Sequence, residues 1–228
     1  INQGKGFEAV WIINNDLLVR EKTLSELVKA WQNSGDHIYG SVSLTADNPE
    51  IVDFGGGVNP DSFKNEFIYN QYRGLPYKEL PPEKIRQVQT IEGSSFLLPL
   101  RIVAKYGFMS TDFFMYAEET DYCYRLRSEG VKTYVVRDSI VLHNNEGSFK
   151  FAGEINWIKA YYRRRNFMRF MMDHFNWTPK QVLNRDYSKY ERHSFKLKWM
   201  ISKSFRERNF EEYCYLKGSI DAANGING

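Results

Sequence analysis

The fold of this chain is decided by the stretch Ala9-Val10-Trp11-Ile12-Ile13-Asn14-Asn15-Asp16. Its first five residues are apolar and partly β-branched, a pattern typical of a buried parallel strand. The run ends in two amides and a carboxylate. Because ligands of open α/β sheets bind beyond the carboxyl ends of the strands, Asp16 is a candidate ligand for a hard divalent cation. An Asn-Asp pair after a strand is also an ordinary turn former.

The segments that follow Asp16 predict a βαβ unit. We expect Thr23 to act as an N-cap, with Glu26 three residues later completing a capping box. The helix should end near Gly35, and Ile38 to Leu44 is typical of the next strand. A strand, an acidic turn, a helix and a strand in this order indicate an α/β sheet.

The same architecture is predicted to continue to about residue 150. In order, the sequence predicts a long excursion over 61–87, a buried strand over 88–98, a helix ending at Gly107, a helix over 116–129, and strands over 132–136 and 139–143. Helical periodicity dominates afterwards. We therefore predict a core over residues 1–150 and a helical, basic region over 151–228 that packs on this core.

The charge of the chain is unevenly distributed. The net charge is +3, yet residues 151–228 carry 15 Lys/Arg against 8 Asp/Glu, and residues 1–150 carry 16 against 20. An acidic body with a basic tail suggests a cation site and a separate surface for phosphates, although a solvated helical face explains the tail equally well.

The composition narrows the class of protein. Cys123 and Cys214 are far apart and have no metal-binding spacing, which argues against a disulfide scaffold and indicates a reducing compartment. No apolar run approaches the roughly 18 residues that cross a bilayer. The basic tail is interspersed with acidic residues and matches no nucleic-acid-binding motif, so we expect no nucleic-acid partner.

The densest acidic cluster is Glu118-Glu119-Thr120-Asp121, at a predicted helix start. Carboxylates packed together raise one another's pKa, and this is one way in which a general base is tuned. A structural origin is equally available, because helix N-termini favour negative charge and Asp121 can pair with Arg125 one turn later.

Two further motifs are ambiguous from the residues alone. His143 ends a predicted strand, where a histidine is more often structural than a ligand. Arg163-Arg164-Arg165 could line a phosphate channel or solvate one helix face. Gly55-Gly56-Gly57 lacks the spacing and the following Lys-Ser/Thr of a nucleotide-binding P-loop.

Taken together and in order, several segments resemble glycosyltransferase family 2, the large GT-A group that includes bacterial rhamnosyltransferase-like enzymes. The strongest match runs from Phe113 to Leu126 and resembles the family's aromatic run, acidic pair, Asp and Arg-containing helix. The other matching segments are Trp11 to Asp16, Gly93 to Pro99, Val103 to Phe108, His143 with Gly147-Ser148, and Tyr161 to Asn166. The resemblance implies a GT-A (Rossmann-like) mixed α/β sheet flanked by helices, followed by a helical C-terminal region.

The resemblance also implies a chemistry, the inverting, metal-dependent transfer of a sugar from a UDP- or dTDP-linked donor to a hydroxyl acceptor. Asp16 would bind Mg²⁺ or Mn²⁺ at the donor diphosphate, and His143 would complete the coordination of the metal. Asn14 and Asn15 would line the donor site. Arg165 would contact phosphate or brace the acidic helix.

The acidic cluster takes the acceptor-side roles in this resemblance. Glu119 stands where the family usually has an Asp as general base, and it would deprotonate the acceptor hydroxyl. Glu118 and Asp121 would orient this base or hold acceptor hydroxyls.

The start of the chain departs from the family pattern. Residues 1–6 resemble the end of the helix just before the metal-motif strand, so the resemblance implies that the N-terminal nucleotide-binding segment is missing and the core is incomplete. This departure keeps open an alternative function, a non-catalytic glycan- or partner-binding module derived from a truncated GT-A domain. A metal-dependent nucleotidyltransferase is a further rival, which the absence of a Gly-rich, Lys/Arg-bearing loop disfavours.

The expected setting is the synthesis of a surface glycan or polysaccharide, in the cytoplasm, with a glycan or a lipid-linked acceptor. The stretch from Phe195 to Phe210 is basic and aromatic. It predicts a peripheral contact with an anionic membrane, at its inner face.

Overall fold

A computed structural model describes residues 6–57, 72–144, 152–184 and 189–226 of the chain. Two compact units make up the fold: Ile1–Ser110 with Glu119–Lys150, and Thr111–Glu118 with Phe151–Gly228. The second unit therefore takes in a short loop from the middle of the chain as well as the C-terminal helices. Residues 61–71 of the predicted excursion and the Gly147-Ser148 segment lie outside the described residues.

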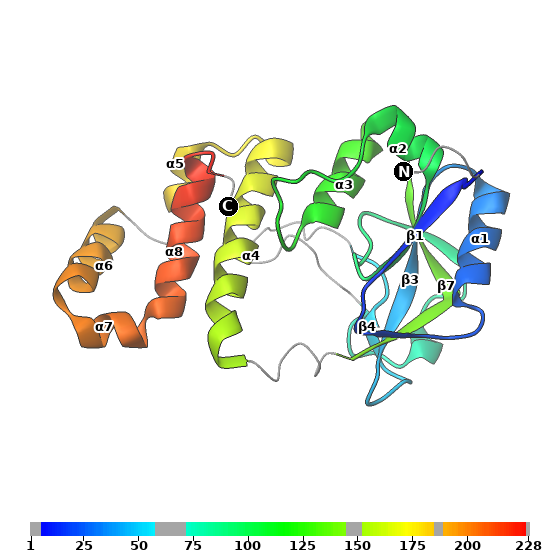
Figure 1. The fold of residues 1–228 in the computed structure, drawn as a ribbon, viewed down its shortest axis with the longest axis horizontal. Coiled ribbons are helices and arrows are strands. Elements are labelled where there is room, and N and C mark those ends of the chain that lie inside the picture. The colour runs from blue at the N-terminus through cyan, green and yellow to red at the C-terminus, as the bar shows by residue number, and fades with distance from the viewer. Residues whose placement is uncertain (1–5, 58–71, 145–151, 185–188, 227–228) are drawn as a thin grey trace. The chain divides into compact units, whose positions relative to one another are not determined.

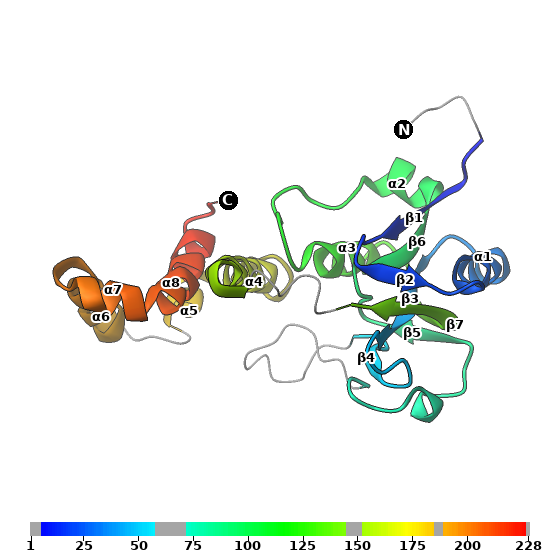
Figure 2. The same ribbon diagram turned by 60° about the horizontal axis from the view of Figure 1, so that its bottom comes forward.

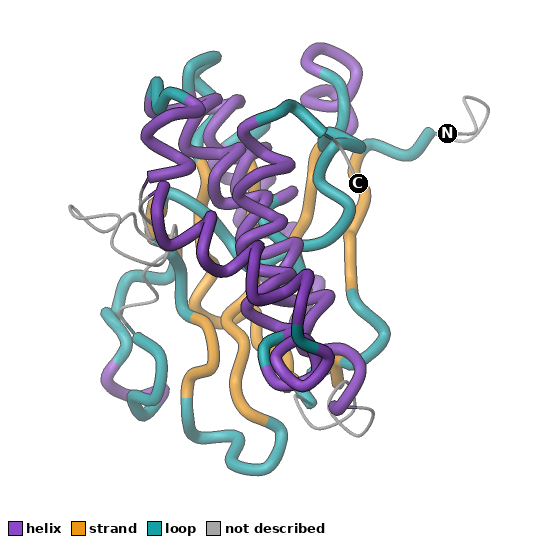
Figure 3. Tube along the Cα trace, turned by 90° about the vertical axis from the view of Figure 1, so that its left-hand side faces the viewer, coloured by secondary structure: helices purple, strands orange, loops and turns teal. Residues whose placement is uncertain are grey.

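The first unit is built on one mixed sheet, whose strands are coloured orange in Figure 3. The strands are β1 (Ala9–Ile13), β2 (Leu17–Val19), β3 (Ile38–Thr45), β4 (Val52–Phe54), β5 (Ile85–Val88), β6 (Ser95–Pro99) and β7 (Thr133–His143). Their order is β1-β6-β3-β7-β2, with β4 paired to β3 and β5 paired to β7. Among these strands β3 and β7 pair in parallel, and the other pairs are antiparallel.

Helices cover both faces of this sheet, with α1 (Thr23–Ser34) on one side and α3 (Glu118–Arg127) on the other (Figure 2). The unit also contains α2 (Leu100–Tyr106) and a short 3₁₀ helix, η1 (Tyr77–Glu79). Side chains alternate between the two faces along β6, which explains why apolar residues pack against helices on both sides of the sheet. Phe96 and Leu98 pack in one apolar cluster with Leu126 of α3, while Leu97 faces the other way and packs with Leu27 of α1.

The predicted βαβ unit is present, but the prediction for its first strand was wrong. β1 lies at the edge of the sheet and pairs antiparallel with β6, so it is neither buried nor paired in parallel. Val10 and Ile13 are exposed. Since β1 and β3 both run antiparallel to β6, they are parallel to each other, and α1 connects them across that intervening strand.

Three local predictions also change. The single strand predicted over 88–98 is two strands, β5 and β6, separated by a loop over 89–94. The two strands predicted over 132–143 are one strand, β7, with a register irregularity opposite β3. Lys22, not Thr23, is the N-cap of α1, because the Thr23 hydroxyl is buried and donates instead to the Ile140 carbonyl.

The second unit consists of helices, as predicted for the C-terminal region. They are α4 (Ala152–Phe175), α5 (Pro179–Asn184), α6 (Lys189–Ile201), α7 (Lys203–Arg208) and α8 (Phe210–Ala223). α4 and α8 lie side by side in Figure 1. Gly218 permits this close approach, since a Cβ there would lie 2.6 Å from the Tyr161 carbonyl oxygen. Within the described residues, no helix combines the length and the hydropathy needed to span a membrane.

Candidate active site

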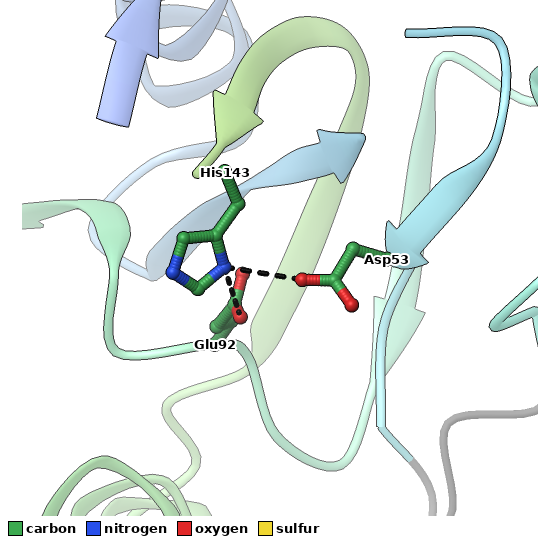
Figure 4. A group of neighbouring side chains, drawn as sticks. All are labelled: Asp53, Glu92 and His143. Carbon is green, nitrogen blue, oxygen red and sulfur yellow. Dashed lines mark hydrogen bonds and ion pairs between the residues drawn. The ribbon is translucent and has the colours of Figure 1, made fainter. Parts of the chain in front are cut away.

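Four polar side chains from separate parts of the chain meet at one edge of the sheet. His143 ends β7, Asp53 lies in β4, Glu92 precedes β6, and Asp16 follows β1. The imidazole Nδ1 of His143 lies 3.1 Å from Asp53 Oδ2 and 3.5 Å from Glu92 Oε1 (Figure 4). Its other nitrogen, Nε2, lies 3.6 Å from Asp16 Oδ2. The imidazole is therefore flanked by carboxylates on both of its nitrogens.

Backbone pairing fixes these side chains relative to one another. Leu17 of β2 is in register with His143, so the turn that holds Asp16 is next to the histidine. The Asn144 backbone N–H donates to the Asp16 carbonyl at 3.1 Å. The Asn14 N–H donates to the carbonyl of Ser94 at 2.8 Å, which ties the same turn to the loop carrying Glu92. Sheet register thus brings four distant residues of the chain together.

The electrostatics of the cluster favour a positive charge at its centre. Hydrogen bonds from His143 to Asp53 and to Glu92 raise the pKa of the imidazole to about 10, and the charges of Glu92 and Asp16 add to this rise. Burial of the ring opposes the shift, since it disfavours the charged form. Without a bound cation the histidine is therefore protonated at neutral pH and offsets part of the acidic charge.

The donor set suits a divalent cation. One ligand atom each of Asp53, Glu92 and His143 lies within 4.8 Å of the other two. Carboxylate oxygens with one imidazole nitrogen are a ligand set for Mg²⁺ or Mn²⁺, with nitrogen favouring Mn²⁺. Two donor atoms bound at ~2.1 Å to one cation lie roughly 3–4 Å apart, so the Nε2–Asp16 spacing also fits.

A neutral imidazole binds a cation through one of its two nitrogens, and the contacts of the acids favour Nε2 over Nδ1. Asp53 also pairs with Arg73, 3.4 Å away, and Glu92 Oε2 accepts a hydrogen bond from the Ser94 hydroxyl at 2.8 Å. Metal-bound histidines usually donate their second ring N–H to a carboxylate, which fixes the ring. Asp53 and Glu92 are placed for this orienting role, and Asp16 is placed beside the nitrogen that remains.

The acidic helix adjoins this cluster through one glycine. Gly93 follows Glu92, and a Cβ at Gly93 would lie 3.5 Å from the carboxylate of Glu119. Thr120 donates to Glu119 Oε1 at 3.4 Å. Asp121 is buried, whereas Glu119 is half-buried. The predicted base therefore lies beside the loop that holds a carboxylate against His143.

Glu118 has a different environment from Glu119. It begins α3, and burial raises the pKa of its carboxyl above the usual range. Its Oε2 atom is buried and makes no hydrogen bond to any residue that the structure describes. Arg125, one turn after Asp121, donates its guanidinium to the carbonyls of Tyr106, the last residue of α2, and of Phe108.

The residues just before α3 have a strained backbone. Tyr116 and Ala117 have φ values of 68° and 71°, the left-handed region that residues with a Cβ seldom occupy. The amide of Asn166 holds them in place, because its Nδ2 donates to the carbonyls of Met115 and Tyr116, at 2.7 Å each. Strained residues of this kind cluster at functional sites, where surrounding contacts fix them.

Arg165, predicted to contact phosphate or brace the acidic helix, is only 1% exposed. Its Nε donates to the Asn166 side-chain oxygen at 2.8 Å, and its Nη2 donates to the Asp112 carbonyl at 2.7 Å. The guanidinium also stacks over the ring of Tyr162. These contacts brace the loop before α3, while a contact with phosphate stays a prediction.

The structure brings together some of the residues that the sequence suggested. Asp16 and His143 are brought together as the resemblance implied, and Asn14 is hydrogen-bonded beside them. Asp53, Glu92 and Asn166 were missed. An acid two residues before three consecutive glycines, Gly55-Gly56-Gly57, was the one available signal for Asp53. Glu92 lies within residues 88–98, which were predicted to form one buried strand, so it was not considered as a site residue.

Comparison with known proteins finds a similar sequence and a similar solved structure. No protein-family model matches the chain. The low-salt glycan biosynthesis hexosyltransferase Agl10 of Haloferax volcanii is 26% identical over 137 residues, which are 60% of this chain and 42% of that protein. A crystal structure of GalNAc-T7 with UDP, GalNAc and Mn²⁺ superposes with a TM-score of 0.53 and 14% identity, covering 95% of this chain and 41% of that one. The chain thus spans less than half of either relative, and the predicted fold class is confirmed.

The first prediction from this geometry concerns His143 in the protein freed of metal by a chelator. A folded-state pKa of about 10, above the ordinary 6.5, stabilises the fold fully below about pH 6.5. This contribution is lost as the pH rises through 10. Denaturant unfolding from pH 6 to 10 should therefore show a steeper loss of stability in the wild type than in His143→Gln. Parallel curves for the two proteins would contradict the raised pKa.

The second prediction concerns the strained loop. Asn166→Ala should lower the free energy of unfolding by about 1–3 kcal/mol, because two carbonyls lose their donor. Replacing Ala117 by glycine, which adopts positive φ without strain, should restore part of that loss. The matched control is Ala104→Gly in α2, where glycine destabilises the helix in either background. Equal effects of the two glycine substitutions in the Asn166→Ala background would contradict the role of strain.

Proposed function

We propose that this chain is the metal-binding, catalytic part of a glycosyltransferase that moves a sugar from a nucleotide-sugar to a hydroxyl acceptor in glycan synthesis. The observation that carries the proposal is the placement of Asp16 and His143 against one another, with Glu119 beside the Glu92–Gly93 loop. The name of the Haloferax relative and the UDP and Mn²⁺ in the GalNAc-T7 crystal structure support the same class of reaction.

In this proposal Asp16 and His143 hold Mg²⁺ or Mn²⁺, and Asp53 and Glu92 orient the histidine ring. The cation, when bound, supplies positive charge that stabilises the departing diphosphate. Asn14 and Asn15, in the turn before β2, line the donor side. The nucleotide is UDP or dTDP.

The acceptor side belongs to α3 in this proposal. Glu119 accepts the proton of the acceptor hydroxyl as its oxygen bonds to the anomeric carbon and the bond to the diphosphate oxygen breaks. One displacement of this kind inverts the anomeric configuration, in the manner of family 2 and its rhamnosyltransferase-like members. Glu118 and Asp121 orient the base or hold acceptor hydroxyls, and Arg165 and Asn166 stabilise the loop that leads into the helix.

The reaction is proposed to take place in the cytoplasm, which is consistent with two free, buried cysteines, Cys123 and Cys214. The acceptor is a glycan, free or lipid-linked. A non-catalytic glycan- or partner-binding module is the second candidate. Titration calorimetry with nucleotide-sugars and Mn²⁺ separates the two, because such a module would show no metal-dependent donor binding.

The third prediction tests the enzyme directly. With a panel of nucleotide-sugars and Mn²⁺, Glu119→Gln should lower kcat by about 10²–10⁴-fold and leave Mn²⁺ binding intact, since it removes only a base. Asp16→Ala should lose both activity and tight Mn²⁺ binding. Glu129→Gln, at an exposed position in the turn that follows α3, is the matched control and should behave as wild type.

Three results would contradict the proposal: turnover that persists in a chelator, full activity of Glu119→Gln, or no metal-dependent donor binding at all. The anomeric configuration of the product, read by proton NMR, tests the inverting step separately. Retention would overturn that step and leave sugar transfer in place.

A further inference from the structure

The outer side of α6 exposes apolar side chains within a basic segment. Leu197, Met200 and Ile201 are 53%, 66% and 74% exposed. Their spacing of three and four residues places them on one face of the helix. We refer to these three residues as the apolar ridge.

The apolar ridge is not the face by which α6 packs in its own unit. Phe195 is buried, and Trp199 stacks on Tyr213 with ring centroids 4.1 Å apart. At ~3.6 residues per turn, Phe195 and Trp199 point away from the ridge. α6 therefore has two apolar faces on opposite sides, of which one packs against aromatic side chains of α7 and α8. In Figure 1, α6 and α7 lie on the side of α8 away from α4, at the margin of the helical unit.

Positive charge surrounds the ridge. Residues 189–208 carry seven Lys/Arg and two Asp/Glu. Lys196 and Lys198 flank Leu197, and Lys203 is exposed just beyond Ile201. Arg206 donates to the carbonyls of Trp199 and Met200, and so holds the end of α6 that presents the ridge.

We propose that this surface binds an anionic lipid bilayer, with the ridge entering the headgroup–acyl boundary and the lysines contacting lipid phosphates. Amphipathic helices with basic flanks bind membranes in this way, since long lysine stems keep the ammonium at the interface while apolar side chains insert. A second copy of the chain is a poor occupant, because pairing would bring two strongly basic surfaces together. The inference stands on α6 and its neighbours α7 and α8, and it is independent of the proposed sugar transfer.

The test is flotation of the full chain with vesicles of phosphatidylcholine alone or mixed with phosphatidylglycerol, at physiological ionic strength. The wild type should bind the anionic vesicles at least about tenfold more tightly, and high salt should weaken this binding because exposed charges are screened. Replacing Leu197, Met200 and Ile201 by serine should abolish flotation. Replacing Lys196 and Lys203 by glutamine should weaken it by severalfold.

Leu24→Ser, at an exposed apolar position of α1, is the matched control and should float as wild type. Unfolding curves establish whether each variant is folded. Because the ridge residues are exposed, we expect their replacement to leave the fold intact. Equal binding to neutral vesicles, or no binding to any vesicle, would overturn the proposal. A dimer seen by light scattering and dissolved by the triple serine variant would show instead that the ridge is a contact between copies.

Discussion

The arrangement of the first unit depends on placing one imidazole among three carboxylates. Asp16, Asp53 and Glu92 come from three separate segments, and their like charges repel at close range. Protonation of His143, or a bound cation, offsets that repulsion. The pairing of β2 and β3 with β7, and of β4 with β3, brings Asp16 and Asp53 to the histidine, and the Asn14–Ser94 backbone hydrogen bond ties in the loop of Glu92. An unusual charge density is therefore maintained by ordinary sheet register, as the proposed cation site requires.

A second constraint lies in the loop before α3. Its two left-handed residues are held by hydrogen bonds from Asn166, and Arg165 braces the loop at Asp112. Thr111–Glu118 thus belongs with the helices of the second unit, although α3 continues into the first. The C-terminal helices consequently fix the backbone that leads into the acidic cluster. Arg165 and Asn166 of α4 therefore have a structural role, which the positive charge of this segment alone did not indicate.

The sequence was informative about those residues of the candidate site that lie at the end of a strand. Asp16 and His143 each stand at such a position, so their proximity could be expected from the topology. Asp53 and Glu92 could not be placed, because their approach to His143 depends on the pairing of β4 with β3 and on the path of the loop over 89–94. The edge position of β1 escaped prediction for a similar reason, since apolar content does not reveal which neighbour a strand takes. Thr23 was misassigned because a tertiary hydrogen bond replaced the local cap.

The most direct test of the account is to observe the ligand of the cation. Pulsed EPR of the Mn²⁺-loaded chain should show nitrogen modulation from one imidazole, which His143→Gln removes and His37→Gln leaves unchanged, because His37 instead accepts from the Lys132 backbone N–H. Asp53→Asn should keep the nitrogen signal but weaken Mn²⁺ binding by about 10–100-fold, as expected of a residue that orients a ligand. Tightly bound Mn²⁺ without nitrogen modulation in the wild type would contradict the assignment of His143 as a metal ligand.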